Sequence, residues 1–450
     1  MSELILDVRL DGYNEPIGIL VRDEHAGLSF NYRPNYLSGE APISLSLSMP
    51  LRQEPYPDSI CRAFFGNLLQ ERDDTMQRVM DRERIERNDI AGLLLHLGKD
   101  CPGAISVLEH GSPPVKVPGN FETDYEVIDD DKIERLVTAL FEREPLPDDV
   151  ADPSPIAGVQ SKVALTVLPD DRFAQPIEGS GAPTTHILKV SNKRRPNETL
   201  LEAASMLLSQ SYGISTAQVG NIEIAGINAL LVERYDRAID EAGHVVRVHQ
   251  EDFAQVLGLP SSLKYERDGQ DGARFDAEAI ARVIDKSVNP AQMRQTIIAA
   301  TLFDLMIGNN DGHAKNFSMI HHPVGTVEFA PRYDLVPIRL FHDYTGELAY
   351  NIGDATCLED ITASNFDQFL ETLGIGSPAA RQRLRNDLAF EIGRHLVDQI
   401  DTLVTNGQKN FADLIASNIR HLFDEFRLEI PQKAQHRDAA IGRGGGWLMS

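Results

Sequence analysis

The segment Asp311-Gly312-His313-Ala314-Lys315-Asn316, followed by Asp334, constrains the fold of this 450-residue chain more than any other feature. Apolar residues recur at helical spacing from 297 to 306, and Gly308 is typical of a helix C-terminus. Residues 317–330 predict a hairpin of two short strands joined by a turn. A helix, a polar loop, a hairpin and a second acidic residue are therefore expected in this order.

An Asp and an Asn separated by four residues, with a later Asp, form the carboxylate–amide layout of a phosphoryl-transfer site. In this interpretation Asp311 accepts the proton of a substrate hydroxyl, and Asn316 and Asp334 hold magnesium against the phosphates of ATP. Oxygen ligands of this kind suit a hard cation. The alternative is that Asp311 and Asn316 only cap turns, that His313 is a hydrogen-bonding spacer and that Lys315 is a solvated charge.

The middle of the chain contains a second set of polar residues. Ala157-Gly158-Val159-Gln160-Ser161-Lys162 precedes an alternating strand at 163–168, and a small-residue loop before a strand suits the cradling of phosphates. Lys189 lies near the end of the next strand, 184–190. Glu202, on a helix at 197–210 that Asn197 is expected to cap, is the candidate partner that would orient Lys189. A surface Lys and a surface Glu are the alternative.

Composition sets the outer limits. Hydrophobic residues make up 42% and charged residues 25% of the chain, as in ordinary globular proteins. The three cysteines are far apart, which fits a reducing cytosol and argues against structural zinc. No apolar stretch of membrane-spanning length and no signal peptide is found, so a cytoplasmic protein with no membrane contact is expected. The net charge of −25 disfavours direct nucleic-acid binding and is compatible with a basic protein partner.

The rest of the pattern predicts short elements separated by linkers. Strands are expected at 4–10, 17–21 and 28–32, with a fourth extended stretch at 45–49 and another at 104–108. Helices are expected between 58 and 97 and at 133–141, and linkers at 111–124 and 145–155. A hairpin at 221–232 leads into Glu233-Arg234-Tyr235, where Tyr235 either contacts adenine or packs between lobes.

Together these residues resemble the HipA family, the serine/threonine-kinase toxins of bacterial HipBA toxin–antitoxin systems. The motifs that carry the resemblance are Ala157 to Lys162, Thr184-Thr-His-Ile-Leu-Lys189, Val232-Glu-Arg-Tyr-Asp-Arg237, Gln250-Glu-Asp252, Gly258-Leu-Pro-Ser-Ser262, Lys264-Tyr-Glu266, Asp311 to Phe317 and Tyr333-Asp334. Similarity extends to the N-terminal region through Leu45-Ser-Leu47 and Gly98-Lys-Asp100, and so covers most of the chain.

The resemblance implies an α+β, two-lobed protein-kinase-like fold with a family-specific, β-rich N-terminal subdomain and a helical C-lobe. The expected divisions are an N-terminal subdomain (1–110), a linker and helix (111–155), a nucleotide-binding N-lobe (156–237), a helical C-lobe (238–430) and a flexible tail (431–450). ATP and Mg2+ are the implied cofactors. The implied partners are a small helix-turn-helix antitoxin, HipB, and a protein substrate such as glutamyl-tRNA synthetase, whose phosphorylation arrests translation and growth and produces persistence.

Carried over by motif, Asp311 is the expected catalytic base, and Asn316 and Asp334 the expected metal ligands. The residues expected to line the ATP site are Ala157, Gly158, Val159, Gln160, Ser161, Lys162, Lys189, Glu233, Arg234, Tyr235, His313, Ala314, Lys315, Asn316, Tyr333 and Asp334.

The chain departs from the family pattern at two places. Pro155 stands at the position of the family's autophosphorylated serine, which leaves the neighbouring Ser154 as the candidate acceptor. The stretch 353–360 is acidic and shorter than the family's Lys-rich loop that approaches DNA, so operator DNA is expected to be reached only through the antitoxin.

Two other functions are open at this point. One is a catalytically silent corepressor that only binds the antitoxin. The other is a metal-dependent hydrolase built on Asp311, His313, His321, His322 and Asp334, because imidazoles close together can bind zinc or iron. The expected position of His321 and His322 at an exposed hairpin turn disfavours the hydrolase.

Overall fold

The computed structural model describes residues 2–69, 74–144, 146–147, 161–323 and 325–433. The N-terminal part, called the N-terminal subdomain below (residues 4–109), is an antiparallel sheet in the order β3-β2-β1-β4. Its strands are β1 (Leu4–Leu10), β2 (Gly18–Arg22), β3 (Leu28–Tyr32) and β4 (Ile105–Glu109). Its helices are α1 (Pro34–Leu37), α2 (Asp58–Gly66), α3 (Asp74–Glu83) and α4 (Ile90–Leu97). Strand and helix residues together form one apolar core.

The extended stretch expected at 45–49 is not a strand. It contains only an isolated antiparallel bridge between Ser46 and Met49. Its polar groups bond to Glu251 and Gln255, which are about two hundred positions later in the chain. The apolar alternation of this segment therefore reflects docking and not sheet pairing.

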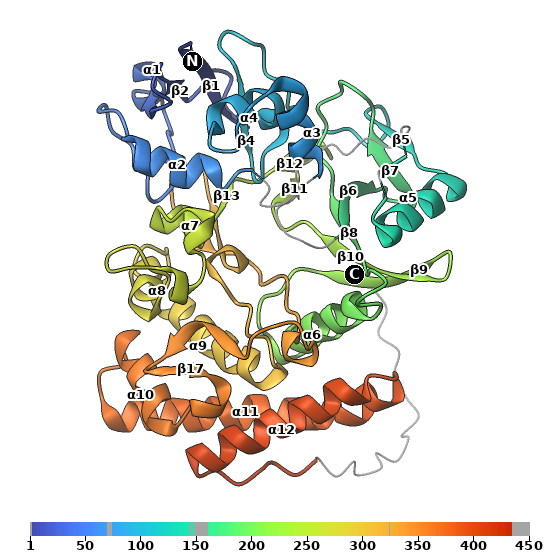
Figure 1. Cartoon of the computed structure of the whole chain (residues 1–450), viewed down its shortest axis with the longest axis vertical. Coiled ribbons are helices and arrows are strands. Elements are labelled where there is room, and N and C mark those ends of the chain that lie inside the picture. The colour runs from blue at the N-terminus through green and yellow to red at the C-terminus, as the bar shows by residue number, and fades with distance from the viewer. Residues whose placement is uncertain (1, 70–73, 145, 148–160, 324, 434–450) are drawn as a thin grey trace.

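A six-stranded antiparallel sheet in the order β5-β7-β6-β8-β10-β9 forms the second layer (Figure 1). Its strands are β5 (Tyr125–Val127), β6 (Lys162–Val167), β7 (Phe173–Pro176), β8 (His186–Val190), β9 (Val219–Ile224) and β10 (Ile227–Glu233). Helix α5 (Asp130–Glu142) packs its apolar stripe against this sheet. The region expected as a linker and helix thus adds a strand and a helix to this layer. Helix α6 (Glu198–Tyr212) packs against β9 and β10.

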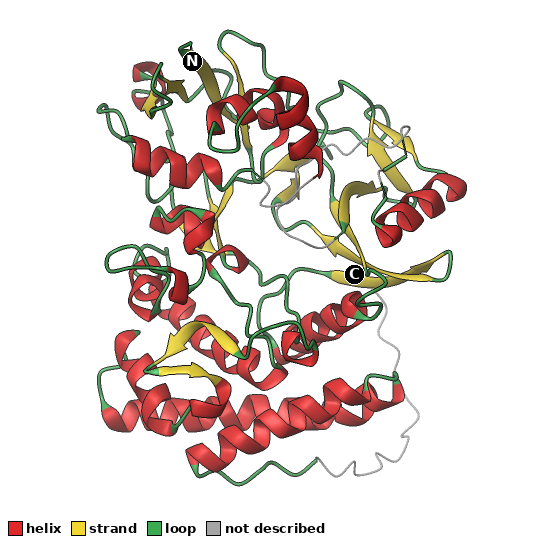
Figure 2. Cartoon of the chain, viewed as in Figure 1, coloured by secondary structure: helices red, strands yellow, loops and turns green. Residues whose placement is uncertain are grey.

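The remaining chain is mainly helical (Figure 2). Its helices are α7 (Phe253–Leu257), α8 (Ala277–Ile284), α9 (Pro290–Ile307), α10 (Ala363–Thr372), α11 (Pro378–Thr405) and α12 (Lys409–Phe426). Short antiparallel pairings join β11 (Arg237–Ile239) to β12 (Val245–Arg247), β13 (Gln250–Asp252) to β14 (Ser318–His321), β14 to β15 (Val327–Phe329), and β16 (Glu347–Ile352) to β17 (Ala355–Cys357). The acidic stretch at 353–360 forms the turn and second strand of the last pair, with Gly353 at φ 60°.

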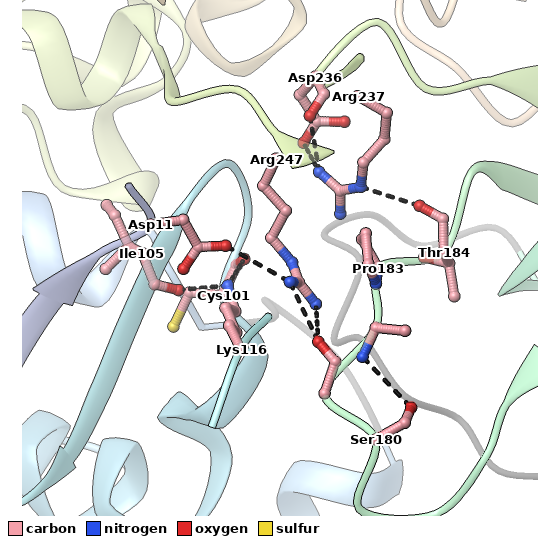
Figure 3. A network of polar contacts seen from close by, with 12 residues as sticks. Asp11, Cys101, Ile105, Lys116, Ser180, Pro183, Thr184, Asp236, Arg237 and Arg247 are labelled. Atoms are coloured by element: carbon pink, nitrogen blue, oxygen red, sulfur yellow. Dashed lines mark hydrogen bonds and ion pairs between the residues drawn. The ribbon is translucent and has the colours of Figure 1, made fainter. Parts of the chain in front are cut away.

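A polar junction connects the N-terminal subdomain to the six-stranded sheet (Figure 3). The guanidinium of Arg247 lies 3.4 Å from the Asp11 carboxylate and donates to the carbonyl of Gly181 at 3.2 Å. Lys116 donates to the carbonyl of Ile105 at 2.6 Å, and Arg237 to that of Thr184 at 2.8 Å. Within the described ranges, no helix has the length and apolar character needed to span a bilayer.

Candidate active site

The first half of the site is a buried lysine between two carboxylates. Lys189, on β8, donates to Glu202 Oε1 at 2.5 Å and to Asp334 Oδ1 at 2.8 Å. Glu202 is fully buried on α6, and Lys189 is also buried. The two residues pair as expected, and the alternative that both are surface residues is wrong. Asn197 is at the N-cap position of α6, but its side chain makes no capping hydrogen bond, contrary to expectation.

Within this cluster Lys189 and Asp334 stabilise each other's charges, whereas at Glu202 burial outweighs Lys189 and raises the pKa of the carboxyl group to about 7. Burial works against the charge of Lys189, but Asp334 and Glu202 outweigh it and raise the pKa of the ammonium. Burial likewise works against the Asp334 carboxylate, but Lys189 and Lys162 lower its pKa well below the usual range. Asp334 has a φ of 59°, in the left-handed region that is rare for residues other than glycine. Such backbone outliers occur where the surroundings hold a side chain at a functional position.

The second half of the site is the loop at 311–316, which starts just after α9. Helix α9 ends at Gly308, with φ 79°, as the sequence predicts. The amide nitrogen of Asn316 donates to the backbone carbonyl of Asp311 at 2.8 Å, and the backbone N–H of His313 donates to the same carbonyl at 2.7 Å. The nitrogen end of the Asn316 amide is thus engaged within the loop, and its oxygen is the end that suits a hard cation.

Tyr265 orients the carboxylate of Asp311. Its hydroxyl donates to Asp311 Oδ1 at 2.6 Å, and its ring meets that of His313 edge-on at 5.1 Å. Burial raises the pKa of Asp311, an effect that the Tyr265 hydrogen bond partly offsets. Burial also lowers the pKa of His313 to about 3, so this imidazole is neutral at physiological pH. His313 Nδ1 is buried and has no hydrogen-bond partner among the described residues.

Residues 233–235, where strand β10 ends, are fixed by an ion pair and by an aromatic contact. The Arg234 guanidinium pairs with Asp236 at 3.0 Å, whereas Glu233 is exposed. The ring of Tyr235 stacks on that of Tyr333 with centroids 5.7 Å apart. This is the packing contact that was one of the two expectations for Tyr235. The Tyr333 hydroxyl in turn donates to the carbonyl of Lys315 at 2.7 Å.

Lys315 is buried, so the alternative that it is a solvated surface charge is wrong. Its side chain is 7% exposed, and its ammonium lies 2.8 Å from Asp252 Oδ2 and 2.9 Å from Asn67 Oδ1. The neighbouring Ala314 is fully buried in the core. Strand β6 begins at Lys162, and the carbonyl of the preceding residue, Ser161, accepts from the N–H of Val190 at 2.9 Å. The expected phosphate-loop residues 157–160 and Ser154 lie outside the described residues.

The histidines proposed for a hydrolase are not brought together. His321 is buried, contrary to expectation, and its Nε2 lies 2.8 Å from Glu251 Oε1. His322 pairs instead with Glu328 at 3.0 Å. No group of three or more His, Cys, Asp or Glu side chains arranged to hold a metal ion occurs in the part of the chain that the structure describes.

Two positions were missed by the sequence reasoning. Tyr265 lies in the motif Lys264-Tyr-Glu266, and the presence of this motif is the sequence signal that could have identified it. Arg332 is almost fully buried and pairs with Asp304 on α9 at 2.7 Å. Because Arg332 is two residues before Asp334, this ion pair connects the backbone of Asp334 to the helix that precedes the 311–316 loop.

Comparisons with known proteins agree with this architecture. A family model described as the HipA-like C-terminal domain matches residues 154–401, and one described as the HipA N-terminal domain matches residues 6–108. The Sinorhizobium fredii protein Y4mE, named as a candidate kinase, is 34% identical over 93% of this chain and 99% of its own length. The Shewanella oneidensis serine/threonine-protein kinase toxin HipA is 29% identical over 69% of this chain and 71% of its own length.

Among solved structures, HipA in the Shewanella oneidensis complex of HipA, HipB and operator DNA is similar with a TM-score of 0.77. The match has 24% identity and covers 94% of this chain and 98% of that one. This similarity confirms the expected α+β kinase-like fold. Since the C-terminal family model alone spans more than half of the sequence and the N-terminal model matches the first sheet, the chain belongs to the HipA family.

Proposed function

We propose that this protein is an ATP-dependent serine/threonine-protein kinase and the toxin of a bacterial toxin–antitoxin module. The observation that carries the proposal is the pairing of Lys189 with Glu202 and Asp334. This cluster lies next to the loop of Asp311 and Asn316, because the charge of Asp334 raises the pKa of Asp311 and the neighbouring Tyr333 bonds to the Lys315 carbonyl. A buried lysine between a helix glutamate and a metal-binding aspartate is the arrangement that protein kinases use to place nucleotide phosphates.

In this proposal Asp311 is the general base. The acceptor hydroxyl oxygen forms a bond to the γ-phosphorus of ATP, the bond from that phosphorus to the ADP oxygen breaks, and the hydroxyl proton passes to Asp311. Tyr265 occupies one carboxylate oxygen of Asp311 and so orients the other toward the acceptor. The raised pKa of Asp311 makes it a stronger proton acceptor than an exposed aspartate.

The residues present fit magnesium and ATP. Asp334 supplies an ionised carboxylate and Asn316 an amide oxygen, which are ligands of the type that Mg2+ prefers. Magnesium, when bound there, would neutralise phosphate charge. The buried, unpartnered Nδ1 of His313 is one further polar atom available at the site. The nucleotide would lie among Ala157–Lys162, Lys189, Glu233–Tyr235, His313–Asn316 and Tyr333–Asp334, with Lys315 contributing its backbone because its ammonium is engaged elsewhere.

The proposed partner is a HipB-like helix-turn-helix antitoxin, because the similar Shewanella oneidensis structure holds HipA with HipB and operator DNA. The net charge of −25 favours a basic partner and indirect contact with DNA. The proposed substrate is a cytoplasmic protein, such as an aminoacyl-tRNA synthetase, whose modification would inhibit translation and arrest growth. Ser154 is the proposed autophosphorylation site.

The proposal is tested with purified protein, γ-labelled ATP, magnesium and a dialysed bacterial cell extract as acceptor. Wild-type protein is expected to label protein serine or threonine, and Asp311→Asn is expected not to. Phosphate on Ser154, absent from Asp311→Asn, is the expected result of mass spectrometry. Wild-type protein that binds an antitoxin but transfers no phosphate would instead be a silent corepressor.

A further inference from the structure

The 311–316 loop is bonded directly to the N-terminal subdomain. The side-chain oxygen of Asn67, just after α2, accepts from the Lys315 ammonium at 2.9 Å, and its backbone carbonyl lies 3.4 Å from the same ammonium. Both side chains are buried, with residue exposures of 3% for Asn67 and 9% for Lys315. A hydrogen bond from a charged donor in such an enclosed place is stronger and more directional than one at the surface.

Both polar atoms of the Asn67 side chain make hydrogen bonds. Its amide nitrogen donates to the carbonyl of Ala63 at 2.7 Å and to that of Leu259 at 2.8 Å. Ala63 belongs to its own helix, whereas Leu259 follows α7 in the helical region. One side chain therefore joins the N-terminal subdomain, the segment after α7 and the loop that carries Asp311.

A second set of bonds reaches the same loop from the other end. Glu251, fully buried on β13, accepts from the Ser46 hydroxyl at 2.5 Å and from the Leu47 N–H at 2.8 Å. The next residue, Asp252, pairs with Lys315 and lies opposite Ser318 in the β13–β14 register. Strand β14 starts two residues after Asn316. Strand β13, which the N-terminal subdomain contacts through Glu251, therefore also positions the C-terminal end of the 311–316 loop through its pairing with β14.

From these contacts we infer that Asn67 is a positioning residue for phosphoryl transfer, acting through Lys315. The N-terminal subdomain would thereby be part of the apparatus that holds Asp311 and Asn316 in register. Lys315 is the residue directly before Asn316, so a shift of its ammonium displaces the proposed metal ligand and, through the 2.8 Å bond from Asn316, the carbonyl of Asp311. The inference rests on the proposed kinase function.

The experiment compares Asn67→Leu, which keeps the branching of the side chain and removes its polar atoms, with Lys315→Met and the double variant. Labelled ATP and a dialysed bacterial cell extract supply the phosphoryl donor and acceptor. A displacement of about 1 Å in a catalytic group can cost about a hundredfold in rate. Each single variant is therefore expected to lower turnover by roughly tenfold to a hundredfold, a larger factor than the accompanying change in the Kd for magnesium–ATP. Lys315→Met removes the contact with Asn67 and also the ion pair with Asp252, so the double variant is expected to be no slower than Lys315→Met alone.

Two further variants separate positioning from general stability. Asn67→Asp keeps an oxygen for Lys315 but loses the two hydrogen bonds to the carbonyls of Ala63 and Leu259, so it is expected to have a lower Tm and yet a higher turnover than Asn67→Leu. Asp11→Asn weakens the other junction with the N-terminal subdomain (Figure 3) and is expected to lower Tm without changing turnover. Hydrogen exchange is expected to accelerate at 311–317 in Asn67→Leu and not in Asp11→Asn. If Asn67→Leu does not fold, Asn67→Ser is used in its place. The serine hydroxyl is one bond closer to the backbone than the Asn67 side-chain oxygen, so it does not reach the Lys315 ammonium.

Wild-type turnover in Asn67→Leu, or losses that multiply in the double variant, would overturn the inference. So would an Asn67→Asp protein that is as impaired as Asn67→Leu. A wild-type protein that transfers no phosphate would count against the kinase proposal itself, and the hydrogen-exchange comparison would still report on whether Asn67 orders the loop.

Discussion

On the sheet side of the site Lys189 is held between two carboxylates, whereas on the loop side Asp311 is held by one tyrosine hydroxyl and by hydrogen bonds to its own backbone. Removing Lys189 from the buried cluster leaves the Glu202 carboxyl group without its partner and so lowers stability, whereas losing the Tyr265 hydrogen bond mainly lets the Asp311 carboxylate change its orientation. The sheet side therefore depends on charge balance and should govern stability and ATP affinity. The loop side depends on local geometry and should govern rate.

The largest expected effect is on the loop side. Asp311→Asn removes the proton acceptor and is expected to lower the rate of phosphoryl transfer by about a hundredfold to ten-thousandfold. Calorimetry should give an unchanged Kd for magnesium–ATP. Asp334→Ala is the matched comparison, because it is expected to weaken magnesium–ATP binding as well. Normal transfer and growth arrest by Asp311→Asn would show that this residue is not the base.

The next effect is on the sheet side. Lys189→Met leaves the buried Glu202 carboxyl group without its hydrogen-bond partner, whereas the Asp334 side chain is 40% exposed and keeps contact with solvent. This variant is expected to lower the free energy of unfolding by about 1–3 kcal/mol. Binding of magnesium–ATP should weaken in parallel. Lys193→Met is the control: Lys193 forms an exposed ion pair with Glu142, and its loss is expected to cost at most about 1 kcal/mol. Equal denaturation midpoints for the two variants would remove the distinction between the two sides.

A smaller change tests whether geometry governs the loop. Tyr265→Phe keeps the ring contact with His313 and removes the hydrogen bond to Asp311. A hydrogen bond to a charged group contributes about 1.5–3 kcal/mol, so turnover is expected to fall by about tenfold or more. Tyr350→Phe is the control, since it loses a buried bond to Thr301 in the core. That variant is expected to lose stability but not turnover.

The smallest expected effect is the pH dependence of stability. The folded-state pKa of Asp311 is raised, mainly by burial, so its ionised form costs stability above that pKa and the cost disappears as pH falls through it. Asp334 behaves oppositely: Lys189 overcomes burial and lowers its pKa, so its contribution is present above the unfolded pKa and is lost as pH falls through the folded value. Asp311→Asn is therefore expected to be more stable than wild type at pH 7. The difference in Tm should shrink on acidification, and a constant difference would exclude this explanation.

Much of the loop side could be predicted because its determinants are local. The helical period up to residue 306, the stop at Gly308 and the strands on either side of 323–326 are all encoded within 40 residues. The contact between Lys189 and Glu202 was also predictable, since a strand leads directly into a helix whose polar Glu202 faces inward. The full burial of Glu202 could not be predicted from the sequence.

What the sequence pattern could not supply are contacts between distant segments. Leu45, Leu47 and Met49 alternate like a strand, but the Leu47 N–H donates to the Glu251 carboxylate and not to a neighbouring strand. Lys315 lies in a polar motif and looks exposed until Asn67 and Asp252 are brought to it by the packing of α2 against α7. Such pairings depend on tertiary packing, which local periodicity does not encode.

The bond between Asn67 and Lys315 joins residues 248 positions apart. Ribosomes add about 5–20 residues per second, so roughly 12–50 seconds separate the synthesis of the two residues. In the later part of this interval the N-terminal subdomain, which has an apolar core of its own, is complete in sequence while the loop of Asp311 does not yet exist. Each new molecule therefore passes through a period in which its N-terminal surface is available to a binding partner and it has no means of transferring phosphate.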